Sequence, residues 1–159
     1  MAPRKSKPVP LPYENATSGR CAKETIEKIL RSIGASSVGV MEDFDKAEVL
    51  VQFTLRGQTV VFRVPAKGYA AQWLQKHPYS YRMRISKTDH ERKALEKGLI
   101  AIYSILRDLI KSNVMALNCG AFSFEGAFLG QIMLPTGETV LERIERDNLL
   151  SLPPPSPAH

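Results

Sequence analysis

Two runs of alternating apolar and polar residues, close together in the chain, constrain the fold more than any other feature. Residues 48–55 and 59–64 place an apolar side chain at every second position, which is typical of strands with one buried face. Arg56-Gly57-Gln58 separates them and suits a hairpin turn. The side chains expected to share the buried face are Val49, Val51, Phe53, Leu55, Val60, Phe62 and Val64. These runs predict an antiparallel hairpin, with a further strand at residues 38–41.

Two helices are expected to flank this hairpin. Apolar residues at helical spacing predict a helix from Ala22 to Ile33, capped by Thr17 or Ser18 and ended by Gly34. A longer helix is expected from Asp89 to about Asn118, with Thr88 as its cap and Glu91 completing a capping box. Its apolar stripe consists of Leu95, Leu99, Ile102, Leu106, Leu109, Ile110, Val114 and Leu117. The stripe can pack within one chain or against a symmetry mate, so a homo-oligomer is possible.

The rest of the chain gives shorter elements. We expect a helical turn at 70–75, a short strand at 79–85, a short helix at 124–129, a hairpin at 131–140 and a final helix at 142–150. Together these predict one α/β domain of the α+β type over residues 17–150. A small antiparallel sheet would be covered by the first helix and the long central helix, and completed by the C-terminal hairpin and helix. A basic, Pro-rich arm (1–16) and a Pro-rich tail (151–159) are expected to be disordered.

The composition is that of an ordinary globular protein, with 43% hydrophobic and 24% charged residues among 159. Cys21 and Cys119 stand alone, without a CxxC or Cys/His cluster, so we expect reduced thiols and no metal centre. Neither a signal peptide nor a run of ~18 apolar residues is present, which favours a cytoplasmic protein that does not enter membranes. The net charge of +6 favours anionic partners.

A basic segment rich in aromatic residues lies between the predicted hairpin and the long helix. From Arg56 to Lys97 the chain has ten cationic side chains and three acidic ones, with Tyr69, Trp73, Tyr79 and Tyr81 between them. Cations neutralise phosphates and rings stack on bases, so this combination is typical of nucleic-acid binding without sequence readout. The competing interpretation is a solvated loop, anchored to the core by Trp73 and one tyrosine.

Particular residues are expected to carry the binding. Those assigned to phosphates are Arg63, Lys67, Lys76, Arg82, Arg84, Lys87, Arg92 and Lys93. Those assigned to bases are Trp73, Tyr79 and Tyr81. The basic residues of the N-terminal arm, Arg4, Lys5 and Lys7, would add to the same field.

Other chemistry has less support in the sequence. Glu42, Asp43 and Asp45 could in principle hold Mg²⁺, but no acid-x-Lys follows on the next strand, as a nuclease site would require. The three histidines form no recognisable nucleophile arrangement, and no phosphate-cradling glycine loop occurs. We therefore expect neither a catalytic residue nor a cofactor, and a metal-dependent nuclease is the weakest alternative.

Several stretches resemble an uncharacterised family of small proteins that recurs in phages and prophages. They are Thr17-Ser18 with Thr25-Ile26-Glu27, then Ile33-Gly34-Ala35, the predicted hairpin, Glu91-Arg-Lys-Ala-Leu95, residues 120–129 and residues 132–140. Gly126 and Gly130 depart from the pattern. The resemblance implies a DNA-metabolism context only by association and supplies no catalytic residue.

These observations lead to two function classes. The first is a non-enzymatic, phage-type accessory protein that binds nucleic acid, in particular single strands, during replication or recombination in the host cytoplasm. The second is a protein–protein adaptor or inhibitor of a host defence or replication factor. The sequence does not separate DNA from RNA.

Overall fold

The computed structural model describes residues 9–151, which form an α+β domain. Its strands make one three-stranded antiparallel sheet in the order β1-β2-β3. The elements, in chain order, are α1 (Arg20–Ser32), β1 (Ser37–Asp43), β2 (Glu48–Leu55), β3 (Gln58–Pro65), α2 (Lys67–Lys76), α3 (Lys87–Asn118), α4 (Phe124–Phe128), the 3₁₀ turn η1 (Leu129–Gln131) and α5 (Val140–Arg146). The expected class and the sheet packed against two helices are confirmed.

The predicted β2–β3 hairpin is confirmed, and the structure adds its register. Val51 of β2 lies between Val40 of β1 and Phe62 of β3. Arg56 and Gly57 form the tip, with φ angles of 52° and 75°. Positive φ angles at both central residues define a two-residue type I′ turn, whose twist matches that of the strands. Strand β3 therefore begins at Gln58.

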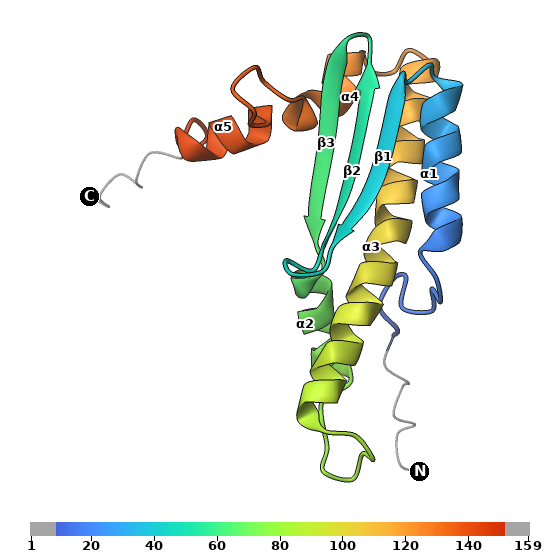
Figure 1. Ribbon diagram of the computed structural model, residues 1–159, viewed down its shortest axis with the longest axis vertical. Coiled ribbons are helices and arrows are strands. Elements are labelled where there is room, and N and C mark those ends of the chain that lie inside the picture. Colours follow the sequence, from blue (N-terminus) through green and yellow to red (C-terminus); the bar gives the residue numbers. More distant parts are fainter. Residues whose placement is uncertain (1–8, 152–159) are drawn as a thin grey trace, which may run out of the picture.

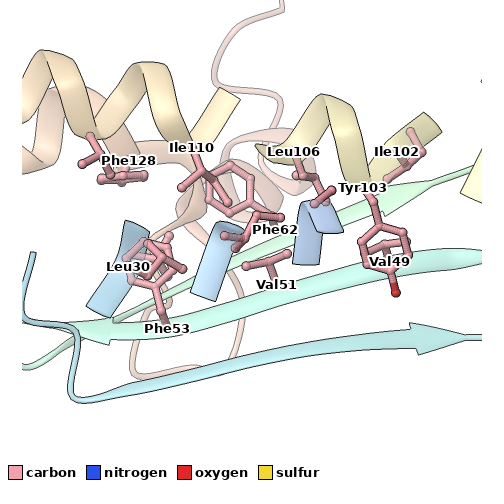
Figure 2. Close-up of a cluster of buried hydrophobic side chains, with 14 of the residues drawn as sticks. Leu30, Val49, Val51, Phe53, Phe62, Ile102, Tyr103, Leu106, Ile110 and Phe128 are labelled. Carbon is pink, nitrogen blue, oxygen red and sulfur yellow. The ribbon is translucent and has the colours of Figure 1, made fainter. Parts of the chain in front are cut away.

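One face of the sheet carries the core. Helices α1 and α3 lie side by side across that face (Figure 1). Figure 2 shows Leu30 of α1 and Leu106 and Ile110 of α3 directed at Val51 and Phe53 of β2. All five side chains are at most 1% exposed. The apolar stripe of α3 therefore packs largely within the chain, although Leu109 remains exposed.

The C-terminal elements close one end of this core. Phe128 of α4 contacts Phe53 and Phe62 edge-on, with ring centroids 5.4 and 6.3 Å apart. The hairpin expected at 131–140 forms as a narrow turn in which Met133 pairs with Thr139, while Ile132 bridges to Val60 of β3. Helix α5 begins at Val140, two residues before the predicted start, because Thr139 and Glu142 make a capping box.

Two predicted helix caps are wrong. Gly19, rather than Thr17 or Ser18, caps α1. A Cβ at Gly19 would lie 2.4 Å from the Tyr103 ring, so packing against α3 requires glycine there. The long helix begins at Lys87 and not at Asp89, because the Ser86 hydroxyl accepts the Asp89 amide.

The strand expected at 79–85 is also wrong, since residues 79 and 80 are irregular and residues 81–85 form turns and bends. The helical turn expected at 70–75 is instead a full helix, α2. Within residues 9–151, no helix is both long and apolar enough to cross a membrane. Residues 1–8 of the predicted arm and 152–159 of the predicted tail lie outside the described residues.

Candidate nucleic-acid interface

A helical hairpin made of α2, the loop 77–86 and the first half of α3 extends beyond the sheet (Figure 1). Its two helices pack closely where α2 begins. A Cβ at Gly98 of α3 would lie only 2.7 Å from the Ala66 carbonyl oxygen, so this approach depends on glycine. Ala70 and Trp73 of α2 and Ala94 of α3 form a small core of their own. The basic-aromatic segment is therefore chiefly an ordered hairpin and not a long loop.

An aromatic cluster fixes the loop of this hairpin. The Trp73 ring stacks on His77 at 4.4 Å between centroids and contacts His90 at 5.2 Å. His90 Nε2 donates to the His77 carbonyl oxygen over 2.6 Å, and the Tyr79 hydroxyl donates to the Ile85 carbonyl over 3.1 Å. Trp73 is only 5% exposed, so its ring is covered on the surface where a base would need to stack.

The N-terminal segment 9–16 lies along the hairpin, a contact that the expected arm did not include. The Tyr69 hydroxyl donates to the Pro12 carbonyl over 2.6 Å, and Lys76 Nζ donates to the Val9 carbonyl. Glu14 lies 2.9 Å from His77 Nε2. Burial, and secondarily the negative charge of Glu14, raises the pKa of the Tyr69 phenol above its usual value. In the sequence, Leu11, an apolar residue between Pro10 and Pro12, gives a hint of this contact, and it packs against the small core of the hairpin.

The predicted cations gather at this end, with one exception. Residues 67–97 have eight basic and three acidic side chains. Seven predicted phosphate-binding residues lie on the hairpin with exposed side chains: Lys67, Lys76, Arg82, Arg84, Lys87, Arg92 and Lys93. Arg63 lies apart, on the outer face of β3 and 3.7 Å from Glu142. The basic N-terminal residues Arg4, Lys5 and Lys7 lie outside the described residues.

Most of these cations are not engaged by acids. Arg92 pairs with Asp89 at 3.1 Å, and Lys76 is held by a main-chain carbonyl. The ion pairs found between residues 9 and 151 involve none of Lys67, Arg82, Arg84, Lys87 and Lys93. The amino end of α3, with its partial positive charge, lies beside Lys87 and adds to the same field.

Tyr81 is the most exposed aromatic residue at this end. Its side chain is 96% exposed, and its ring lies 5.9 Å from that of the half-buried Tyr79 in an edge-on contact. Because residues 79–85 are not a strand, the rings and arginines are not forced onto opposite faces. Arg82 and Arg84 follow the exposed Tyr81 within the same loop.

The acidic alternative is not assembled. Successive side chains of β1 point to opposite faces of the sheet, so Glu42 lies on the inner face and Asp43 on the outer face. Asp43 instead accepts the Lys46 amide over 3.0 Å. Between residues 9 and 151, no three His, Cys, Asp or Glu side chains are grouped so that they could hold a metal ion.

Comparison of the chain with protein-family models, with curated proteins and with solved structures finds no match.

Proposed function

We propose that the α2–α3 hairpin binds single-stranded nucleic acid, with its cations on phosphates and Tyr81 on a base. The observation that carries the proposal is the placement of seven exposed cations and one almost fully exposed ring on a single projecting element. Phosphate contacts give affinity without sequence readout, and a base can stack on an exposed ring only where it is unpaired. Trp73 and Arg63 have no part in this version of the site.

The wider role remains the one that the sequence suggests: a phage-type accessory protein in replication or recombination, acting in the host cytoplasm. A contact of this kind needs no reaction at the site. Phosphate and stacking contacts suit a non-enzymatic protein that binds nucleic acid, and both DNA and RNA offer these contacts.

Fluorescence anisotropy of labelled single-stranded DNA, single-stranded RNA and duplex DNA across a salt series tests this proposal. Replacing Arg82, Arg84 and Lys87 together by Ala should weaken binding and flatten the dependence of log K on log salt by about 2, at ~0.7 per lost phosphate contact. The matched control replaces Arg31, Lys46 and Lys111, three exposed cations elsewhere, and changes the net charge equally. Equal effects of the two triple variants would show only a loss of overall charge and would contradict the assigned site.

A second candidate is the protein–protein adaptor. The same loop exposes Met83 and Ile85, at 36% and 40%, beside Tyr81. Apolar and aromatic side chains surrounded by arginine are common at the centre of protein interfaces. Binding of a protein partner that depends weakly on salt, together with no shift of any nucleic acid, would favour this candidate.

A further inference from the structure

The outer edge of the sheet at β1 has no partner in the part of the chain that the structure describes. Strand β1 pairs only with β2, so a row of its backbone N–H and C=O groups faces outward. Proteins commonly protect such edges with proline or lysine, and β1 contains neither. Its only charged residues are Glu42 and Asp43, at the end of the strand.

The core is also incomplete at this edge. Val38 and Val40, on the inner face of β1, are half-exposed, whereas Phe53 and Val51, opposite them on β2, are fully buried. Apolar side chains at the inner side of the edge therefore gain burial if the sheet continues past β1.

On the outer face of β1, the projecting side chain of Met41 lies two residues from Gly39, where the missing side chain leaves a gap. Met41 is 62% exposed. Gly39 lacks a side chain, and a Cβ built on it has no atom within 4 Å. A shallow groove runs over this part of the face, with Leu50 and Gln52 of β2 along its side.

We propose that β1 pairs with β1 of a second copy of this chain, antiparallel and about a two-fold axis through Val40. In an antiparallel ladder, opposing residues lie on the same face of the sheet. At a two-fold axis, one residue must therefore oppose its own copy, and here that residue is Val40. Val40 is the middle residue of the seven-residue strand, so this register alone pairs all of β1. Met41 of each copy then opposes Gly39 of the other, and the projection covers the gap.

The charges agree with this register. Glu42 opposes Val38, and Asp43 opposes Ser37, so no like charges meet. An axis through Glu42 would instead bring two carboxylates face to face. The paired copies form a continuous six-stranded antiparallel sheet. Because β1 of one copy runs opposite to β1 of the other, the two basic hairpins point to opposite ends of that sheet. The proposal does not depend on nucleic-acid binding by those hairpins.

Sedimentation equilibrium of the full chain, nuclease-treated and at high salt, tests the pairing. The average mass should rise with concentration from 17.7 kDa toward twice that value. Met41→Lys should raise the dimer dissociation constant by about tenfold or more, because the contact occurs twice by symmetry. Met115→Lys, at a side chain 64% exposed on α3, is the matched control and should dimerise as the wild type does.

Hydrogen exchange of the wild-type protein gives an independent readout, should Met41→Lys fail to fold. The outward-facing amides of β1 should become more protected as concentration rises, while those at the β2–β3 tip should not change. A mass of 17.7 kDa at every concentration overturns the proposal. A dimer that responds equally to Met41→Lys and Met115→Lys, whether both weaken it or neither does, overturns the proposal too. So does a dimer that forms without added protection of the β1 amides.

Discussion

His90 Nε2 lies 2.6 Å from the carbonyl oxygen of His77, thirteen residues earlier in the chain. This hydrogen bond joins the first turn of α3 to the residue that follows α2. His90 is only 3% exposed, so water cannot easily replace it as the donor. The bond and the contact of His90 with Trp73 therefore hold the loop that carries Tyr81, Arg82 and Arg84 in one arrangement.

Replacing His90 by Ala should lower the free energy of unfolding by about 2–3 kcal/mol, from the unpaired carbonyl and the lost packing. Urea denaturation followed by circular dichroism measures this change. Glu91→Ala, at the exposed neighbouring position, is the control and should stay within about 0.5 kcal/mol of the wild type. Equal stability of the two variants would show that the His90–His77 bond does not hold the loop.

Gly98 and Gly68 should respond in opposite directions to the same substitution. Both lie within helices, where alanine normally stabilises by about 0.5–1 kcal/mol. At Gly98 the new Cβ would lie 2.7 Å from the Ala66 backbone oxygen, so Gly98→Ala should destabilise by about 1–3 kcal/mol. At Gly68 the space is open, and Gly68→Ala should stabilise. Thermal unfolding of the two variants side by side checks the sign of each change.

Tyr103 should make the protein sensitive to alkaline pH. Burial, followed by a hydrogen bond to Glu42, raises the pKa of this phenol well above its usual 10.0. A group whose pKa is raised on folding contributes stability that is complete below the unfolded pKa and is lost as the pH rises above it. The free energy of unfolding should therefore fall above about pH 10, measured by urea titration at a series of pH values.

Tyr103→Phe should flatten that decline, because the group that must stay protonated is gone. Its effect at neutral pH should be small, since the ring and its packing against Gly19 remain. Tyr81→Phe, at an exposed ring, provides the control for losing a phenol elsewhere. A decline above pH 10 that is unchanged in Tyr103→Phe would place the sensitivity at other tyrosines, such as Tyr13 and Tyr69.

The elements predicted well are those fixed by local pattern. Alternation in 48–64 determines which side chains face the core, and Arg56-Gly57 supplies the positive φ angles that the turn needs. The long stripe of α3 likewise predicts one helix. The strand expected at 79–85 was wrong because Tyr79-Ser-Tyr81 mimics a period of two, while the Ser86 cap and a short connection between two packed helices impose turns.

The contacts missed in the candidate site join residues distant in sequence. Tyr69 and Pro12 are 57 positions apart, and Lys76 and Val9 are 67 apart. Local periodicity in the sequence does not indicate contacts between such distant residues, so the N-terminal segment was expected to make no contact with the hairpin. The role expected for Trp73 depended on exposure, which Ala70, Ala94 and the rings of His77 and His90 jointly remove.

If the proposed interface is correct, Tyr81 contributes to binding by stacking alone. Tyr81→Ala should weaken single-stranded DNA binding by about 5–150-fold, the loss of ~1–3 kcal/mol from one stacked base, whereas Tyr81→Phe should bind as the wild type does. Duplex binding should change little, because paired bases offer no free face. Phe44→Ala, at another ring 80% exposed but on the β1–β2 loop, is the control. Anisotropy at fixed salt measures the affinity of the wild type and of each variant for single-stranded and for duplex DNA. Equal losses for single strands and duplex would contradict stacking.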